Sequence, residues 1–261
     1  MTAEYWLKQT VGKPLFPDIE WSKPEQLSRA GKLAIIGGTP AGFIATSKSY
    51  QTALSEGIGK VRVIMPDSLK KLTPPDTPDI TFSASNPSGG FSKEALPELC
   101  ASLEWADAAL FIGDAGKNSE TAIVYETLLR ESSKFAILTR DAIDLQKNSA
   151  EQLLLRENTA LVASFAQLRS LLQAVYYPKI LTLSMPLRMF VDAMHKVTIT
   201  YPTTIATLFN EQIIVAYNGQ VSTTTCTNAM RIWSGEVATK TAAYLIWSPH
   251  KPFEAVSTSV L

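Results

Sequence analysis

The stretch KLAIIGGTPAGFIATSKSYQTALSEGIGKVRVIMP, Lys32 to Pro66, indicates the fold class. It opens with the apolar composition of a buried strand, KLAIIGG, that ends in glycines. Residues 40–56 follow as a predicted helix, which Gly57 and Gly59 close, and residues 60–66 form a second predicted strand. A strand, a helix and another strand in this order are the unit from which a parallel α/β sheet is built.

The same alternation continues through most of the chain. Residues Thr73–Phe91 are punctuated by proline and glycine and are predicted as a loop. Further predicted helices lie near Ser92–Leu103, 118–133, 141–156 and 165–175, and further predicted strands cover 106–114, 134–139 and 159–164. The pattern predicts a mostly parallel sheet with helices on both faces.

The last third of the chain changes character. Short runs of β-forming residues occur at Lys196–Tyr201, at 203–208 and on both sides of an Asn218-Gly219 hairpin turn. A helix is predicted from Ser234, and a final helical stretch begins near Pro252. We expect a single α/β domain over residues 32–261, preceded by a leader at residues 1–31 that is rich in aromatic residues and proline.

The composition excludes several classes of function. The 261 residues include 24 Lys and Arg against 24 Asp and Glu, so no net charge favours nucleic acid or an anionic membrane. The two cysteines, Cys100 and Cys226, and the two histidines, His195 and His250, show no metal-ligand or redox spacing, so no metal site is expected. No apolar run approaches about 18 residues, and we expect a soluble, cytoplasmic protein.

Two glycine-containing loops follow predicted strands, where open α/β sheets bind ligands. In GGTPAGF, Gly37, Gly38 and Gly42 could let the backbone approach a ligand, although a plain tight turn explains them equally well. In GDAGKNSET, Gly113 and Gly116 precede Lys117, which could contact a polyanion beside a helix N-terminus. A solvated capping turn is the alternative for this second loop.

Two acidic residues complete the candidate site. Asp141, in LTRDAI, follows a predicted strand and either faces the cleft or caps the next helix. Ser234-Gly235-Glu236 opens a predicted helix whose first N–H groups could hold an anion, yet Glu236 places an acid there. Glu236 is a catalytic base beside a phosphate, an acid that complements the helix dipole, or the remnant of a lost site.

In this order, the loops resemble those of the ribokinase-like superfamily, and most closely its ADP- or ATP-dependent NAD(P)H-hydrate dehydratases. The stretches that carry the resemblance are AIIGGTPAGFIATSKSYQTALSEGIGKVRVIMP, ADAALFIGDAGKNSETAIVYETL, AILTRDAIDL and IIVAYNGQVSTTTCTNAMRIWSGEVATKTAAYLIW. The resemblance implies a three-layer α/β/α sandwich around a mostly parallel sheet. It also implies binding of ADP or ATP, with or without Mg²⁺, and phosphorylation followed by phosphate elimination on hydrated NAD(P)H.

The resemblance also implies roles for individual residues. The family's Gly-Thr-Gly-Asp box, an anion hole followed by a catalytic base, matches Ser234-Gly235-Glu236, with Glu236 in the place of the base. Gly113 and Gly116 match the glycines of a Gly-Pro-Gly-Leu-Gly-like loop, in which Asp114 and Ala115 replace the residues between the glycines. Substrate-side positions are matched by Gly37, Gly38, Gly42 and Asp141.

Several positions depart from the family pattern. Trp233 stands where the box has a glycine, Ala163–Ala166 replace a His-Pro-Gly-Glu segment, and Thr200-Tyr201 replace a Lys-Gly pair. Three hypotheses follow: a weak or altered dehydratase-type enzyme, a non-catalytic nucleotide or metabolite binder, or a structural homologue. The partner of a structural homologue would be another protein, such as a second copy of the chain.

Overall fold

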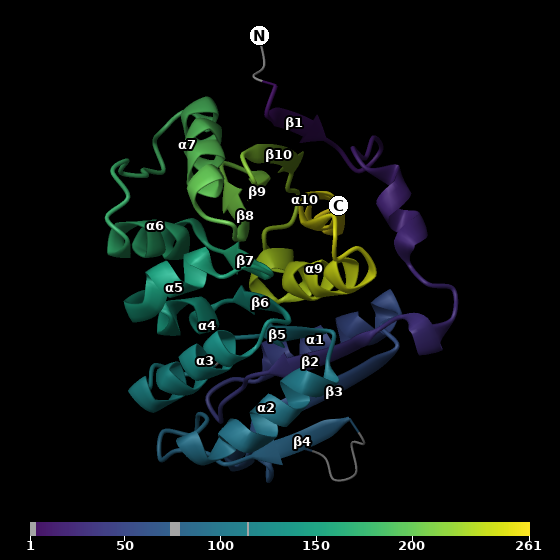
Figure 1. Ribbon diagram of the computed structural model, residues 1–261, viewed down its shortest axis with the longest axis vertical. Helices are drawn as coiled ribbons and strands as arrows, with labels where there is room; N and C mark the ends of the chain where they lie inside the picture. Colours follow the sequence, from purple (N-terminus) through teal and green to yellow (C-terminus); the bar gives the residue numbers. More distant parts are fainter. Residues whose placement is uncertain (1–3, 74–78, 114) are drawn as a thin grey trace.

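In the computed structural model, which describes residues 4–73, 79–113 and 115–261, a single sheet of ten strands runs through the molecule (Figure 1). The order of the strands is β1-β10-β9-β8-β7-β6-β5-β2-β3-β4. Their bounds are β1 (Trp6–Gln9), β2 (Lys32–Ile36), β3 (Lys60–Pro66), β4 (Ile80–Ser83), β5 (Ala108–Phe111), β6 (Phe135–Thr139), β7 (Thr159–Ala163), β8 (Thr204–Phe209), β9 (Gln212–Tyr217) and β10 (Gln220–Thr225).

The sheet is parallel from β4 to β8 and changes direction at β9. Strand β9 is antiparallel to both β8 and β10, and the Asn218-Gly219 turn joins it to β10, as predicted. Strand β2 lies between β3 and β5, so the chain leaves β2 on one side and returns on the other. Such a reversal opens a crevice beyond the carboxyl ends of the strands, where open α/β sheets bind ligands.

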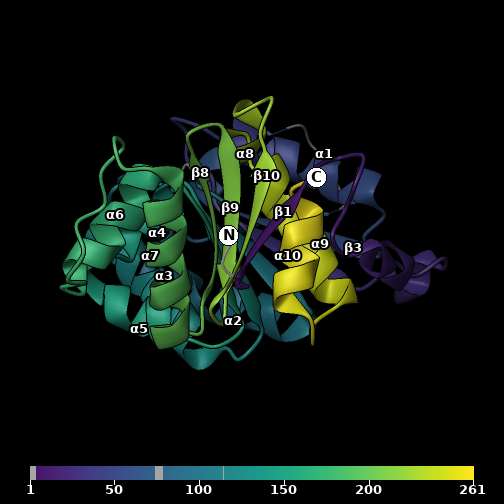
Figure 2. The ribbon, with the colours of Figure 1, turned by 90° about the horizontal axis from the view of Figure 1, so that it is seen from above.

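Helices cover both faces of this sheet and complete three layers (Figure 2). One core lies against α1, α9 and α10, and the other lies against α2 to α7. Strand β2 shows the alternation, because Leu33 and Ile35 belong to the first core and Ala34 and Ile36 to the second. The helices are α1 (Ile44–Glu56), α2 (Leu96–Trp105), α3 (Ser119–Glu131), α4 (Asp141–Leu145), α5 (Ala150–Leu155), α6 (Phe165–Ala174), α7 (Leu187–Thr200), α8 (Met230–Trp233), α9 (Glu236–Trp247) and α10 (Pro252–Ser259).

Local signals in the sequence place several helix ends. Helix α1 ends at Gly57, which has φ 85° and whose N–H donates to the carbonyls of Ala53 and Leu54. Helix α6 begins with a capping box, in which Ser164 and Gln167 satisfy each other's backbone N–H groups. The three-layer α/β/α architecture predicted from the sequence is confirmed.

The structure corrects the prediction at three segments. Strand β4 lies within the segment predicted as a loop, of which residues 74–78 lie outside the described ranges. The helix predicted over 141–156 is divided into α4, a 3₁₀ turn at Lys147–Ser149 and α5. Residues Lys196–Tyr201, predicted as β-structure, instead form the end of α7 and its C-cap.

The leader joins the sheet through β1, which pairs in parallel with β10. Gln9 is buried, and its Nε2 donates to Thr224 Oγ1 at 2.9 Å and to the carbonyl of Ser257 at 2.5 Å. The Tyr5 ring stacks on His195 with centroids 3.7 Å apart. These contacts give His195 a structural role at the edge of the sheet.

Candidate functional site

The glycines after β2 and β5 lie at the crevice where the sheet reverses. Gly37 has φ 149°, and a Cβ atom on it would lie 2.2 Å from the Ile112 carbonyl oxygen. A Cβ on Gly113 would lie 2.2 Å from the Arg140 Cβ and 2.4 Å from the Asp141 Oδ1. Only glycine allows the loops after β2, β5 and β6 to approach one another this closely.

The loop after β2 is closed on itself. Thr39 and Gly42 exchange both backbone hydrogen bonds at 3.0 Å, which makes a tight turn between Gly38 and α1. A Cβ on Gly38, which has φ 101°, would contact Leu69 Cδ1 at 3.1 Å and Thr46 Oγ1 at 3.5 Å. Of the three candidate glycines in this loop, Gly37 packs against Ile112, Gly38 packs against Leu69 and α1, and Gly42 shapes the turn.

The loop after β5 meets the start of α4. The Gly116 N–H donates to Asp141 Oδ2 at 3.0 Å, so Asp141 binds a neighbouring loop. Gly116, the exposed Lys117 and Asp141 line one cavity of about 230 Å³, together with Asp144. Asn118 caps α3, as the alternative interpretation of this loop predicts, by accepting the Glu120 N–H at 2.8 Å. Asp114 lies outside the described residues.

Tyr125, on α3, is fully buried near Asp141. Burial raises the pKa of its phenol, and the negative charge of Asp141 raises that pKa further. Within the described ranges the Tyr125 hydroxyl has no hydrogen-bond partner. The neutral phenol of Tyr125 therefore lies near the Asp141 carboxylate, which accepts the Gly116 N–H.

The start of α9 is built around Gly235. Gly235 has φ 84°, and a Cβ on it would lie 2.7 Å from Ile112 Cδ1 and 2.8 Å from Ser49 Oγ. The Thr239 N–H donates to the Gly235 carbonyl at 3.0 Å and closes the first turn. The N–H groups before Thr239 belong to the turn in which a helix lacks intrahelical acceptors. They carry the positive end of the helix dipole toward the crevice.

Two hydroxyl groups of α1 lie near these loops, that of Ser49 beside Gly235 and that of Thr46 beside Gly38. Ser49 is 0% exposed and Thr46 is 1% exposed. Neither hydroxyl has a hydrogen-bond partner in the described part of the chain. Buried hydroxyls are normally satisfied, so the Ser49 hydroxyl beside Gly235 and the Thr46 hydroxyl beside Gly38 are exceptions.

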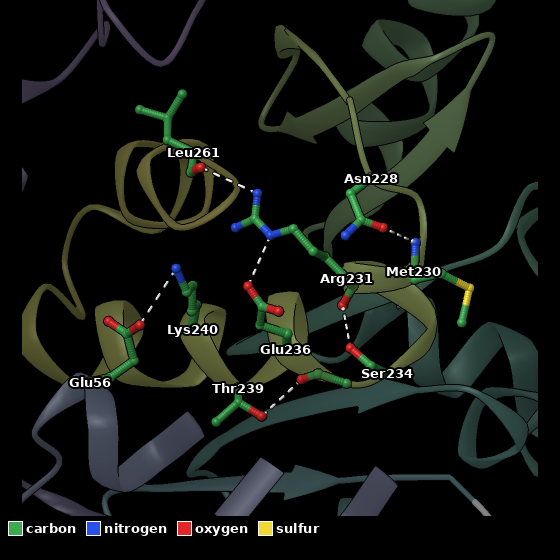
Figure 3. A network of polar contacts seen from close by, with 10 residues as sticks. Glu56, Asn228, Met230, Arg231, Ser234, Glu236, Thr239, Lys240 and Leu261 are labelled. Carbon is green, nitrogen blue, oxygen red and sulfur yellow. Dashed lines mark hydrogen bonds and ion pairs between the residues drawn. The ribbon is translucent and has the colours of Figure 1, made fainter. Parts of the chain in front are cut away.

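Glu236 is held in an ion pair (Figure 3). Its Oε1 accepts from Arg231 Nε at 2.9 Å, and Arg231 Nη1 donates to the main-chain oxygen of Leu261 at 3.3 Å. Glu236 also lines a groove of about 390 Å³ between α1 and α9, together with Lys48 and Lys240. The structure therefore places Glu236 and Asp141 in different cavities.

Arg140 is a residue of the crevice that the sequence reasoning did not include. It has φ 57°, a left-handed conformation that is uncommon for a residue other than glycine. Its Nη1 donates to the carbonyl of Trp233 at 2.5 Å, and its own carbonyl accepts from Gln167 Nε2 at 2.6 Å. The one signal in the sequence for Arg140 was its position directly after a buried strand. Arg231 was also missed.

Charged groups of both signs line the two cavities. Lys48, Lys240, Glu56 and Glu236 line the groove between α1 and α9, and Lys117, Asp141 and Asp144 line the cavity beside the loop after β5. Over the described residues, no group of three or more His, Cys, Asp and Glu side chains could hold a metal ion. The part of the chain that the structure covers also holds no helix with the length and apolar character to cross a membrane.

Comparison with known proteins gives structural matches only. No family model and no curated protein sequence matches the chain. A ribokinase-like superfamily protein from Enterococcus faecalis is 16% identical, with a TM-score of 0.73 over 100% of this chain and 87% of that chain. A hypothetical protein from Streptococcus mutans is 15% identical, with a TM-score of 0.71 over 93% and 84% of the two chains.

An enzyme of named activity has the same architecture. An ADP/ATP-dependent NAD(P)H-hydrate dehydratase from Bacillus subtilis, crystallised with ATP and Mg²⁺, is 13% identical. It has a TM-score of 0.63 over 95% of this chain and 86% of that chain. Similarity at this level of identity shows the fold, which is ribokinase-like, as the resemblance predicts.

Proposed function

We propose that this chain is a divergent, nucleotide-binding protein of the NAD(P)H-hydrate dehydratase type, which holds the phosphates of ADP or ATP at the start of α9. The observation that carries the proposal is the position of Gly235. It begins a twelve-residue helix at the crevice, in contact with the loop after β5 and with the unpartnered hydroxyl of Ser49. A helix N-terminus in this position favours a phosphate group.

The remaining candidate residues divide between two parts of the ligand. The Ser234 and Gly235 N–H groups, which were candidates for the anion hole, already donate to the carbonyls of Met230 at 2.8 Å and Ile232 at 3.4 Å. The anion hole would therefore consist of the amides that follow, from Glu236 onward, and the loop with Gly113, Gly116 and Lys117 would contact the rest of the nucleotide. The second ligand, a molecule like hydrated NAD(P)H, would lie against Gly37 and Gly38, in the loop that the Gly42 turn shapes. Asp141 accepts the Gly116 N–H and would support the loop after β5. No carboxylate cluster suits Mg²⁺ in the described residues, so an accompanying Mg²⁺ would depend on the phosphates and water for its ligands.

In the catalytic form of the proposal, Glu236 takes the proton of the substrate hydroxyl. The hydroxyl oxygen forms a bond to the terminal phosphorus while that phosphorus separates from the nucleotide, and elimination of the new phosphate restores the dihydronicotinamide. A base must lie about 2.6–3.2 Å from the proton donor, and a misplacement of about 1 Å can cost a hundredfold in rate. Because the Glu236 carboxylate is already paired with Arg231, we expect weak turnover.

A second candidate function is a non-catalytic binder of nucleotides or related metabolites on the same fold. The Arg231–Glu236 ion pair favours it, because the Glu236 Oε1 that would have to reach the substrate hydroxyl already accepts a hydrogen bond from Arg231 Nε at 2.9 Å. Binding at the helix start would survive this pairing, whereas proton abstraction would not.

Two measurements separate the candidates. Binding is measured from the melting temperature with ADP, ATP and AMP, because a ligand at 100 times its dissociation constant adds about 2.7 kcal/mol to the unfolding free energy. Turnover is measured with chemically prepared NADH hydrate and either nucleotide, for wild type and Glu236→Gln. Binding with turnover that Glu236→Gln abolishes supports the enzyme, and binding without turnover supports the binder. If no nucleotide changes the melting temperature, both are wrong and the structural hypothesis remains.

A further inference from the structure

The first turn of α9 combines a positive helix end with a negatively charged side chain. The dipole and the free N–H groups of that turn favour an anion, but Glu236 is its first residue and carries a carboxylate. A phosphate bound to the same turn would lie close to that carboxylate, and like charges at such a distance repel strongly where water is partly excluded. An anion can bind there only if a cation compensates for Glu236.

Arg231 is placed to do this. Its Nε lies 2.9 Å from Glu236 Oε1, and its Nη1 lies 3.3 Å from the main-chain oxygen of Leu261. A guanidinium has five N–H donors, and within the described residues these two contacts are the only side-chain hydrogen bonds of Arg231. Its Nη2 therefore remains available, and the side chain is 25% exposed.

We infer that Arg231 is an anion-binding residue of this site, which holds Glu236 with Nε and presents Nη2 to a phosphate group of the ligand. The inference rests on the proposed function, because the ligand is the nucleotide held at the start of α9. A guanidinium that touches a carboxylate on one edge and a phosphate on another keeps both anions in place. Arg231 and Glu236 then act as a unit.

The site does not rest on the helix terminus alone. The Ser49 hydroxyl, which is 0% exposed, faces Gly235 at the start of the helix and has no partner in the part of the chain that is described. Arg231, the cation of the ion pair, comes from α8 and would contact the ligand from another side. A ligand phosphate here would meet the α9 amides from one direction and Arg231 from another.

The test is a double-mutant cycle on ADP affinity, measured by isothermal titration calorimetry with the full chain. Arg231→Ala is expected to weaken ADP binding by about 10- to 100-fold, since a charge-assisted hydrogen bond is lost and Glu236 is left to repel the phosphate. Glu236→Gln is expected to bind ADP at least as tightly as wild type. In the Glu236→Gln background the loss from Arg231→Ala is expected to be at least threefold smaller than in wild type.

Arg130→Ala is the control for removal of an arginine from an ion pair elsewhere, because Arg130 pairs with Glu131 at 3.8 Å on α3 at an exposed position. It is expected to leave ADP affinity unchanged. If Arg231→Ala lowers the melting temperature so far that titration fails, Arg231→Gln, which is shorter than arginine but keeps part of the aliphatic chain and two N–H donors, replaces it in the same cycle.

The outcomes separate this inference from the function on which it rests. If wild type binds ADP and Arg231→Ala costs the same factor in both backgrounds, the residue acts only through local structure and the inference is wrong, while nucleotide binding stands. An unchanged affinity in Arg231→Ala also refutes it. If wild type binds no nucleotide, the proposed function fails and this inference fails with it.

Discussion

Arg140 joins the end of β6 to the segment that precedes α9, because its Nη1 lies 2.5 Å from the carbonyl oxygen of Trp233. The two residues are 93 positions apart in the sequence. This contact fixes the position of the short α8–α9 segment over the carboxyl edge of the sheet. It also places a guanidinium above Gly113, whose missing Cβ would otherwise lie 2.9 Å from Arg140 Nε.

Replacement of Arg140 separates its side-chain contact from its backbone strain. Arg140→Ala is expected to lower the free energy of unfolding by about 1.5–3 kcal/mol, because the charged hydrogen bond to Trp233 is lost. Arg140→Gly loses the same contact but relieves φ 57°, so it is expected to be about 1 kcal/mol more stable than Arg140→Ala. Urea denaturation measures both. Equal stability of the two variants would mean that the left-handed conformation carries no strain.

A methyl group at Gly235 is expected to disturb the start of α9. Its Cβ would lie 2.7 Å from Ile112 Cδ1, and φ 84° disfavours any residue with a side chain. Gly235→Ala is expected to lower the free energy of unfolding by about 1–3 kcal/mol and to weaken ADP binding. Gly12→Ala is the control, since no atom lies within 4 Å of the Cβ that it would add. A loss of the same size in Gly12→Ala would show that neither the close contact with Ile112 nor the positive φ of Gly235 causes the effect.

The layers of the fold could be predicted because their signals are local. Buried strands such as β2 and β6 are short apolar runs, and helices such as α1 and α6 carry their own terminal signals in Gly57 and Ser164. The end of α7 could not be predicted in this way. Its residues favour β-structure, but Met194 and Val197 belong to a helical face that packs against the sheet, and packing outweighs propensity.

The candidate site could be predicted only as a set of loops. The sequence places Gly37, Gly113 and Gly235 after strands or before a helix, and the structure brings Gly37 and Gly235 against Ile112, the residue before Gly113. The pairing of Glu236 with Arg231 could not be predicted, because the left-handed Gly235 lies between them and no helical spacing relates them. The positive φ of Arg140 likewise depends on contacts made far away in the sequence.

Arg156 is expected to contribute strongly to the stability of the fold and to have no role in ligand binding. Its guanidinium donates to the carbonyls of Leu129 at 2.8 Å and of Ser132 and Lys134 at 2.7 Å, which closes the end of α3 against the start of β6. Arg156→Ala leaves these carbonyls without a donor, so we expect a loss of about 3–5 kcal/mol in the free energy of unfolding.

Arg156→Lys tests the geometry of this contact. A lysine keeps the charge but cannot reach three carbonyls in a planar arrangement, and it is expected to recover less than half of the loss. Guanidinium chloride denaturation gives the stabilities, and ADP titration is expected to give wild-type affinity for Arg156→Lys. Full recovery by lysine would show that charge, rather than the planar set of donors, closes the helix.

Tyr125 gives a prediction for alkaline pH. Burial, and then the charge of Asp141, raise the pKa of its phenol in the folded protein above the value of about 10 in the unfolded chain. Its contribution to stability is therefore complete below about pH 10 and decreases as the pH rises above that value. We expect the free energy of unfolding to fall between about pH 9.5 and 11, and to fall less steeply in Tyr125→Phe.

Below pH 9, Tyr125→Phe is expected to be as stable as wild type or more stable, because the lost hydroxyl has no hydrogen-bond partner among the described residues. Tyr176→Phe, at a side chain that is 92% exposed, is the control for urea titrations at each pH. A Tyr125→Phe curve parallel to that of wild type would show that the phenol ionises as readily in the folded protein as in the unfolded chain.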